Sequence, residues 1–426
     1  MDTTSPRPSP PESTGSPREG PALSRSRLRG LGAVWLPGNA ASPLLWNAVT
    51  AVLMAVQVQR IDPAGKVHNL ALLTGCGAVM TLLVQPLAGR LSDRTRSRWG
   101  RRSPWVLGGA VGGAVSLVLM GAAHSIGVLL PTYLLLVLTV NSAQLPMNAM
   151  MPDQVPRERR GLFASLAAVG QSLGGLAGQL IASASVADIA HGYWVVAAIL
   201  VVVLVAFAVT AREPSSRDMA DDPFNWTDLL RSYWVNPRRN PDFAWVFISR
   251  FLLVTGYLLT ASYNLYVLQD YIGLGDRAVH YVPLLSALTF ACVLALSAVG
   301  GPWSDRVGRR KPFIQASSVV FGVGLLVPLL LPTVTGMIIA AVVGGVGYGM
   351  FGSVDAAVMS EVLPSKAGYG KDLAVINLSW SIPQAFSPFL AGALVTATGG
   401  YTALFPIGAA LAVMGGLSVT FAKGVR

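Results

Sequence analysis

Twelve long apolar stretches are the feature that most limits how this chain can fold. Each is close to the roughly 20 residues that a helix needs to cross the hydrocarbon of a bilayer. Only 12% of the residues are charged, about half the share in a typical soluble domain. The sequence therefore predicts an all-α membrane protein with transmembrane helices near 38–60, 69–91, 104–123, 126–151, 161–184, 192–211, 243–270, 281–303, 312–332, 333–360, 372–397 and 400–421.

The longest polar connection, 212–242, divides these spans into six and six. We expect a disordered basic cytoplasmic tail over 1–34, because its start is rich in Pro, Ser and Arg and lacks an apolar core. A first six-helix bundle is predicted over 35–211. The connection itself forms a cytoplasmic central loop, and a second bundle follows over 243–426.

Lysine and arginine predict the orientation of the chain. Of 31 such residues, 27 fall in connections on one side of the predicted membrane, three on the other and one, Arg250, inside a span. Because cytoplasmic loops carry the excess of positive charge, both termini are expected in the cytoplasm of a multi-pass plasma-membrane protein. Basic loops that face anionic lipid of the bilayer also account for the net charge of +11, so no nucleic-acid partner is expected.

The two halves repeat each other. Gly-Arg-Arg-Ser-Pro at 100–104 recurs as Gly-Arg-Arg-Lys-Pro at 308–312, an offset of 208 residues. The segment 149–156 recurs at 357–364 with the same offset, and Ser-Asp-Arg at 92–94 recurs at 304–306. Two pseudo-symmetric six-helix bundles of like orientation are a known transporter plan, with a site between them that is exposed to alternate sides.

The repeated loops carry charges suited to a cytoplasmic gate. A carboxylate at the end of a helix can pair with arginine in one state and release it in another. The alternative is that these charges only fix the topology. The predicted gate residues are Gly89, Asp93, Arg94, Gly100, Arg101, Arg102, Asp153, Gly301, Asp305, Arg306, Gly308, Arg309, Arg310 and Glu361.

Polar side chains recur three, four or seven residues apart on spans one, four, seven and ten, which places them on one face of each helix. Polar groups inside a membrane are costly and commonly face a cavity, although they also join helices by hydrogen bonds. With Trp380 as a ring-stacking surface, the predicted substrate-binding or coupling residues are Asn47, Gln57, Asn141, Gln144, Asn148, Arg250, Tyr257, Asn264, Tyr348, Asp355 and Trp380.

Arg250 and Asp355 are the charges that lie clearly inside predicted spans. Counted from the cytoplasmic ends of their helices, both lie at about 9–12 Å depth, so they are able to pair. An unpaired charge there costs several kcal/mol. One hypothesis is that Asp355 exchanges a proton during transport while Arg250 lowers its pKa or binds substrate. A static structural pair is an equal alternative.

Gly89-x-x-Ser92-Asp93-Arg94 followed by Gly100-Arg101-Arg102 resembles the signature between helices two and three of the major facilitator superfamily (MFS). The longer string 92–105 is similar to the branch of glycoside–cation and sucrose–proton symporters. The resemblance implies the MFS fold, with helices one, four, seven and ten around the cavity, and symport of a small sugar or glycoside with protons. Melibiose-type carriers have a cation-binding Asp where this chain has Gln85, which argues against sodium coupling by that route.

Other functions stay open at this point. The same superfamily contains proton-driven exporters of drugs and secondary metabolites, and an apolar cavity would suit them equally. A non-transporting membrane sensor would normally carry a larger soluble domain. An enzyme is not expected, because we find no Ser/His/Asp or His/Glu constellation. No His/Cys/carboxylate cluster has ligand spacing, so no metal is expected, and no cofactor is expected either.

Overall fold

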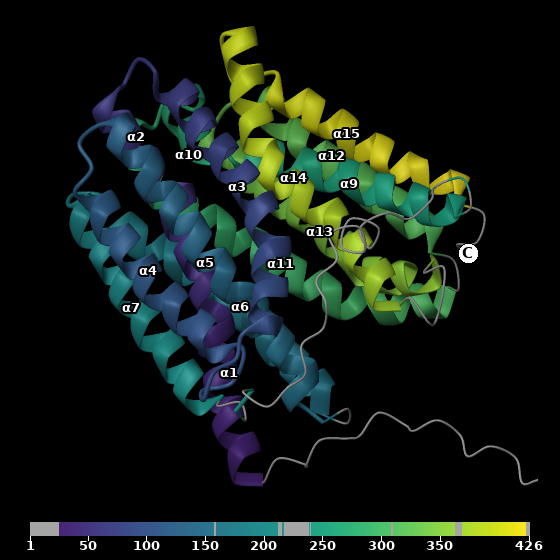
Figure 1. Cartoon of the computed structure of the whole chain (residues 1–426). Helices are drawn as coiled ribbons and strands as arrows, with labels where there is room; N and C mark the ends of the chain where they lie inside the picture. The colour runs from purple at the N-terminus through teal and green to yellow at the C-terminus, as the bar shows by residue number, and fades with distance from the viewer. Residues whose placement is uncertain are drawn as a thin grey trace, which may run out of the picture.

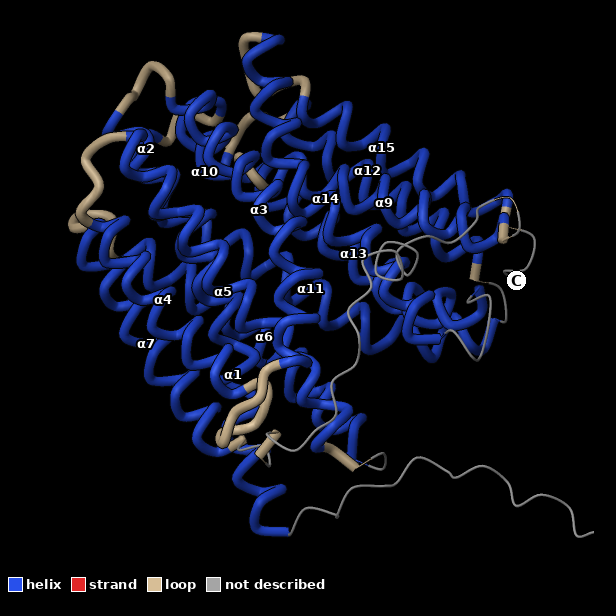
Figure 2. The backbone as a smooth tube through the Cα atoms, in the orientation of Figure 1, coloured by secondary structure: helices blue, strands red, loops and turns tan. Residues whose placement is uncertain are grey.

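The computed structural model describes residues 25–156, 159–211, 215–216, 238, 240–307, 310–362 and 369–422. Within this part the chain forms helices joined by loops, and it contains no strand (Figure 2). Eleven helices in the described part are long and apolar enough to cross a membrane. A further long helix, α14, holds Pro383 and Pro388 and completes a set of twelve spans. The predicted all-α membrane fold is confirmed.

The first half contains six spans. Its first span is continuous from Arg25 to Ile61 and includes a π-helical segment, η1. A π-helical segment inside an α-helix is uncommon and is frequent at functional sites. The elements of this half are α1 (Arg25–Ala48), η1 (Val49–Leu53), α2 (Met54–Ile61), α3 (Lys66–Arg94), α4 (Ser103–Gly121), α5 (Ile126–Gln154), α6 (Arg160–Ala184) and α7 (Ile189–Thr210).

The second half contains the other six spans. Its elements are α9 (Pro241–Ala261), α10 (Asn264–Tyr266), the π-helical η3 (Val267–Tyr271), the 3-10 turn η4 (Gly275–Arg277), α11 (Ala278–Val307), α12 (Lys311–Leu330), α13 (Val334–Val362), α14 (Tyr369–Thr398), α15 (Leu404–Ser418) and the 3-10 turn η5 (Val419–Phe421). The ninth and tenth predicted spans, 312–332 and 333–360, are separate helices, because α12 ends at Leu330 and α13 begins at Val334.

Two predicted boundaries are wrong. Residues 25–34 were expected in the disordered tail, but they form the start of α1. Leu31 and Trp35 are buried there, and the indole ring packs 5.4 Å from Phe163 and 5.7 Å from Phe207. The apolar side chains of this stretch therefore hold it against α6 and α7. The seventh span was expected to run unbroken over 243–270, but it is interrupted after Ala261.

The repeat seen in the sequence is also present in the helices. Helices α5 and α13 both contain 29 residues and begin 208 positions apart. Helices α4 and α12 also begin 208 positions apart, and each has a proline in its first turn. Packing repeats as well: α4 contacts α5 and α7 as α12 contacts α13 and α15, and α1 contacts α6 and α7 as α9 contacts α14 and α15. Each half therefore has the same internal arrangement.

The two halves lie side by side and meet along two helix pairs. Figure 1 shows the first half from purple to teal on the left and the second from green to yellow on the right. Helix α3 of the first half packs against α14 of the second, and α6 of the first packs against α11. The same two positions of each half, its second and fifth spans, thus form the contact.

The hydrophobic core joins the halves at one end of the molecule. We call the end with the connections 62–65, 185–188 and 272–277 the tight end, and the end with 95–102 the basic end. The larger cluster of buried apolar residues includes Leu53 and Leu73 of the first half and Leu268 and Val282 of the second. A smaller cluster, built around Phe313 and Val354, belongs to the second half alone.

Glycine controls how closely α6 lies against α1. Gly170, Gly174 and Gly178 are four residues apart and form one stripe on α6. A Cβ at any of them would collide with a backbone carbonyl oxygen of α1. Small residues at this spacing allow membrane helices to approach closely. The carbonyl groups concerned belong to Leu36, Ala40 and Leu44.

Candidate functional site

A buried ion pair marks the interior of the second half. Arg250 on α9 places its Nε 3.5 Å from Oδ2 of Asp355 on α13. The two side chains are only 11% and 15% exposed. Removing either partner of a buried ion pair leaves the other as an uncompensated charge, so each side chain stabilises the other in the interior. The two intramembrane charges singled out by the sequence are therefore neighbours.

Four aromatic rings form a cluster that reaches this ion pair through Trp380. Tyr257 of α9 and Tyr348 of α13 stack with centroids 4.7 Å apart and an interplanar angle of 24°. Phe321 of α12 packs at 6.0 Å from Tyr257 and 6.1 Å from Tyr348. Trp380 of α14 lies 6.3 Å from Tyr348, and the Arg250 guanidinium is 5.9 Å from its ring. We call Tyr257, Phe321, Tyr348 and Trp380 the aromatic cluster.

This combination of groups has a definite chemistry. Tyrosine and tryptophan offer an apolar face for a ring together with a polar group for a hydroxyl. A guanidinium adds fixed donors, and a carboxylate beside it can accept or release a proton. The aromatic cluster with Arg250 and Asp355 is therefore suited to a neutral, hydroxylated ring whose binding is linked to a proton.

The first half contributes amides and hydroxyls instead. Asn47 of α1 accepts a hydrogen bond of 3.1 Å at Oδ1 from Gln179 of α6. The Ser42 hydroxyl donates to Oε1 of Gln144 at 3.1 Å and so joins α1 to α5. Asn141 of α5 is 5% exposed, and its amide donates to the carbonyl of its own helix at Val137. Asn47 and Gln144 thus take part in hydrogen bonds between helices of this half, whereas Asn141 bonds within its own helix.

Gln57 does not join either group of residues. Its amide nitrogen donates to the carbonyl oxygens of Met120 at 2.7 Å and Ala123 at 3.0 Å, and its Oε1 accepts from Tyr193 at 2.8 Å. With 5% exposure and all these partners supplied by α4, α7 and the turn after α4, Gln57 serves the packing of the tight end. Its expected contact with substrate stays a prediction.

Asn148 and Asn264 also lie apart from the ion pair. Asn148 is exposed on α5, and Asn264 begins the short α10 after the interruption of the seventh span. That interruption shifts the helical register, so the spacing of seven from Tyr257 no longer keeps Asn264 on the same face. Their predicted contact with substrate stays a prediction.

A polar network joins the halves at the tight end. Lys66 at the start of α3 lies 2.8 Å from the Asp270 carboxylate of η3 and 4.9 Å from the centroid of the Tyr266 ring. The Tyr401 hydroxyl, from the connection before α15, donates to Asp270 at 2.8 Å. Burial, and then the bond to Asp270, raise the pKa of Tyr401, so it stays a neutral donor. We call Lys66, Asp270 and Tyr401 the latch.

Further hydrogen bonds between the halves surround the latch. The hydroxyls of Tyr266 and Tyr263 donate to backbone carbonyls of the first half, and Ser183 of α6 donates to a carbonyl of the second. Tyr266 donates to Ala55 at 2.8 Å, Tyr263 to Val67 at 3.3 Å and Ser183 to Val279 at 2.7 Å. These bonds lie at the tight end, where the larger hydrophobic cluster also crosses between the halves.

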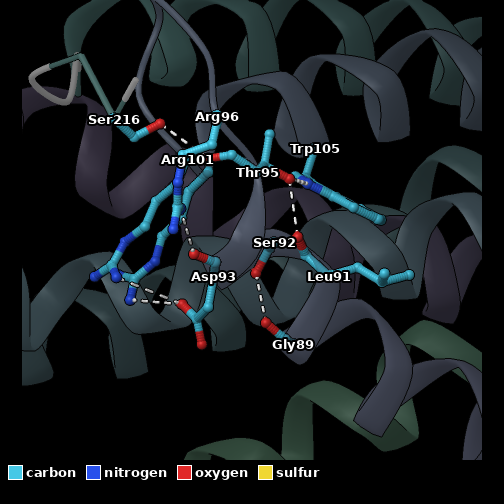
Figure 3. Close-up of polar contacts among 10 residues, drawn as sticks. Gly89, Leu91, Ser92, Asp93, Thr95, Arg96, Arg101, Trp105 and Ser216 are labelled. Carbon is cyan, nitrogen blue, oxygen red and sulfur yellow. Dashed lines mark hydrogen bonds and ion pairs between the residues drawn. The ribbon is translucent and has the colours of Figure 1, made fainter. Parts of the chain in front are cut away.

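The predicted gate loop of the first half is held together by its own residues. The Asp93 carboxylate lies 3.8 Å from Arg101 and 3.7 Å from Arg102, whose side chain is 6% exposed (Figure 3). Gly100 has a φ of +88°, a conformation that side chains rarely adopt. The signature thus forms a compact turn in which an aspartate is bound by arginines of the same half.

Two residues outside the signature fasten this loop from opposite sides (Figure 3). The Trp105 indole donates to Oγ1 of Thr95 at 2.7 Å, and that hydroxyl donates to Leu91 of α3. Ser216 is 2% exposed, and its hydroxyl donates to the carbonyl of Thr95 at 2.9 Å. The Ser216 amide donates to the Ser97 carbonyl, and the Ser97 amide donates to the Ser216 hydroxyl. The start of the central connection is therefore anchored on the gate loop.

The remaining gate residues are placed only in part. Arg94 ends α3, and a Cβ at Gly89 would meet nothing within 4 Å. Arg310 precedes α12 as Arg102 precedes α4, with similar backbone angles. Helices α5, α11 and α13 include Asp153, Gly301, Asp305, Arg306 and Glu361, but the side chains at these positions lie outside the described residues, as do Gly308 and Arg309 entirely.

Sequence reasoning missed several residues that the structure brings to these places. Gln179 and Ser216 gave no signal because their partners are amide or backbone groups of distant segments. Phe321 looked like one apolar residue among many. The latch residues come from the start of α3, from η3 and from the connection before α15, and no spacing rule links them. A search for charges at or near the ends of the predicted spans would have found Lys66 and Asp270.

A match to a family model shows which family this chain belongs to. The model described as MFS/sugar transport protein matches residues 69–404, which is more than half of the chain. The chain belongs to the MFS/sugar transport protein family. This family membership agrees with the signature around Asp93 and with the twelve spans in two equivalent halves. It also accounts for an all-helical fold with the candidate site inside a bundle.

Sucrose and pentose carriers are among the curated relatives of this MFS protein. The sucrose transport protein SUC4 of Arabidopsis thaliana is 31% identical over 121 residues, 23% of this chain and 24% of its own length. The sucrose transport protein SUT1 of Oryza sativa subsp. japonica is 28% identical over 171 residues, 34% of this chain and 31% of its own. The arabinose-proton symporter of Bacillus subtilis is 29% identical over 110 residues, 25% of this chain and 24% of its own length. The matches thus span about a quarter to a third of these relatives.

Solved structures show the same fold over nearly the whole chain. A nucleoside transporter, NupG, superimposes with a TM-score of 0.72 at 12% identity, covering 92% of this chain and all of that one. A D-xylose-proton symporter gives a TM-score of 0.71 at 13% identity, covering 94% and 98%. At such low identity these matches establish the MFS architecture alone.

Proposed function

We propose that this protein is a proton-coupled symporter of a sugar or glycoside, working by alternating access in the plasma membrane. The observation that carries the proposal is the Arg250–Asp355 pair beside the aromatic cluster in a family of sugar transport proteins. The rings stack on the sugar, and the carboxylate takes up the coupling proton. The named activities of the sucrose and arabinose relatives support the same substrate class.

The orientation follows from charge. With the basic end in the cytoplasm, as the positive-inside rule requires, the tight end faces outward. In this orientation the latch and the larger hydrophobic cluster close the outer side, which supports an inward-facing state. Proton exchange at Asp355 alternates with pairing to Arg250: the ionised carboxylate holds the guanidinium, and the protonated acid releases it to donors and acceptors of the sugar.

The decisive experiment separates coupling from binding. In proteoliposomes, Asp355→Asn is expected to abolish accumulation of labelled sugar driven by a pH gradient while sparing downhill exchange. Asp276→Asn, at an exposed position in η4, is the matched control and keeps both activities. Equal loss of both activities in Asp355→Asn, with thermal unfolding of the purified variant like that of the wild type, would identify a static pair.

The wild-type protein supplies a second test that needs no mutation. Binding of sugars, followed by the shift in unfolding temperature, should depend on pH and be indifferent to sodium, since Gln85 stands where a cation-binding carboxylate is expected. A shift that requires sodium contradicts proton coupling. A screen in which sugars give no shift, while the protein confers resistance to toxic compounds, favours export.

A further inference from the structure

A groove on the outer surface of the first half has no role in the transport site. It lies between α4 and α5 near the basic end and has a volume of about 370 Å³, which is within the usual range of small-molecule sites. Its walls are mainly apolar. They are formed by Pro104, Trp105 and Gly108 of α4 with Leu138, Thr139 and Ser142 of α5.

The groove opens toward the membrane. Along α4, Val111 is 59% exposed and Val115 is 50% exposed, and along α5, Leu135 and Leu138 are 36% and 41% exposed. In a multi-pass membrane protein, such a row of exposed apolar side chains on neighbouring helices faces the hydrocarbon. Whatever enters the groove from this side comes from within the bilayer.

A missing side chain creates the groove. A Cβ at Gly109 would collide with Ala143, and one at Gly112 would press on Thr139, so these glycines serve helix packing. Gly108 is different, because a Cβ there would meet nothing within 4 Å. Close approach of helices therefore does not explain this glycine. Its effect is to leave open space beside Trp105.

The loop directly before Pro104 and Trp105 of the groove is rich in arginine. The loop that leads into α4 carries Arg98, which is exposed and lies 5.6 Å from the ring of the exposed Trp99, and Arg101, whose side chain is 25% exposed. Lys and Arg at the cytoplasmic surface attract anionic lipid headgroups, and tryptophan is common at the headgroup level. An apolar groove next to a basic loop matches the two parts of an anionic phospholipid.

We propose that this groove binds an acyl chain of an anionic phospholipid, whose headgroup lies against Arg98 and Arg101. Trp105 connects the bound lipid to the gate loop, because the same indole that lines the groove donates to Thr95. A chain in the groove keeps the indole in this position. Lipid occupancy thus stabilises the gate loop in the conformation with Asp93 bound to arginine.

The first test measures lipid retention and does not depend on transport. The protein is reconstituted in phosphatidylcholine vesicles containing phosphatidylglycerol, then extracted and analysed for co-purified lipid. The wild type should retain phosphatidylglycerol in preference to phosphatidylcholine. Gly108→Leu, which fills the groove, should reduce this retention several-fold. Gly127→Leu is the matched control, since a Cβ at this exposed glycine of α5 also meets nothing within 4 Å, and it should behave as the wild type.

The second test addresses the headgroup and the link to the gate loop. Replacing Arg98 and Arg101 by Gln should remove the preference for phosphatidylglycerol. Trp105→Phe should keep the lipid but lose the stabilisation of the loop, read as faster proteolysis after the arginines of 96–102. Retention by Gly108→Leu equal to the wild type overturns the proposal. Equal retention of both lipids by the wild type overturns the anionic part of it.

Discussion

Gln57 shows how a polar residue in a membrane span can serve packing instead of transport. It satisfies two main-chain carbonyls at the end of α4 and accepts a hydrogen bond from a buried tyrosine of α7. The amide supplies both a donor and an acceptor, which is why no apolar residue replaces it without loss. The residue is therefore a structural element of the tight end.

Gln57→Leu should lower the stability of the folded protein. Leaving a buried donor or acceptor without a partner costs about 1–3 kcal/mol. The Tyr193 hydroxyl and the Ala123 carbonyl lose the hydrogen bond that Gln57 supplies, while the Met120 carbonyl keeps its bond from the Ala123 amide. Thermal unfolding in detergent is expected to shift to lower temperature, with unchanged affinity for sugar in the fraction that stays folded. A variant with wild-type stability but impaired sugar binding would show that Gln57 contributes to the binding site.

The sequence could predict the pair of Arg250 and Asp355 but not the setting of Gln57. Two opposite charges at similar depth in spans of one half have few other partners, because the surrounding helices are apolar. Gln57, in contrast, is bonded mainly to backbone carbonyls, which every residue has. Nothing in the side-chain pattern distinguishes Met120 or Ala123 as its acceptors, so spacing alone could not predict these contacts.

At the scale of helices, the stripe on α6 determines how closely α1 and α6 pack. Gly170, Gly174 and Gly178 each face a carbonyl of α1. The spacing of four residues was visible in the sequence, but the helix that it faces was not. Many glycines of this chain lie in apolar runs, and only the structure separates those that contact a neighbouring backbone from Gly161, where an added Cβ would meet nothing within 4 Å.

Gly174→Val should disrupt the first half. The added side chain collides with the backbone of α1 at Ala40, and overpacking of this kind costs about 1–3 kcal/mol or more. Lower yield of folded protein and a lower unfolding temperature are expected. Gly161→Val on the same helix is the control, because its side chain has open space, and it should leave both quantities unchanged. Equal effects of the two variants would show that helix propensity, not the contact, is responsible.

For the whole molecule, the sequence predicted the division into halves but not the state in which they are found. The repeats at 100–104 and 308–312 lead directly to equivalent helices. A transporter of this plan has at least two arrangements of its halves with one sequence, so no local pattern selects between them. The latch and the shared core at the tight end supply that information.

Breaking the latch should shift the molecule toward opening at the tight end. Lys66 and Asp270 are 15% and 39% exposed, so their attraction is partly screened and we expect only about 0.2–1 kcal/mol. That corresponds to a change of up to a few fold in the population of the open state. Asp270→Asn is the test variant, and the exchange Lys66→Asp with Asp270→Lys should restore part of the effect.

Maleimide labelling can report this shift. Ala71→Cys places a thiol at a buried position beside Gly392, where α3 meets α14, in a background with Cys76 and Cys292 replaced by Ala. Labelling should be faster when Asp270→Asn is added, while Asp276→Asn should leave it unchanged. An unchanged labelling rate with Asp270→Asn would show that the hydrophobic core alone keeps this end closed.

The location of the ion pair and its rings has a consequence for the ancestry of the chain. Arg250, Asp355 and the aromatic cluster all come from the second copy of the repeat, and in the first copy the corresponding interior is bonded through amides and hydroxyls. After duplication, the two copies therefore specialised in different tasks. Chimeras that exchange halves with a relative at the central connection should inherit the driving ion from the donor of the later half.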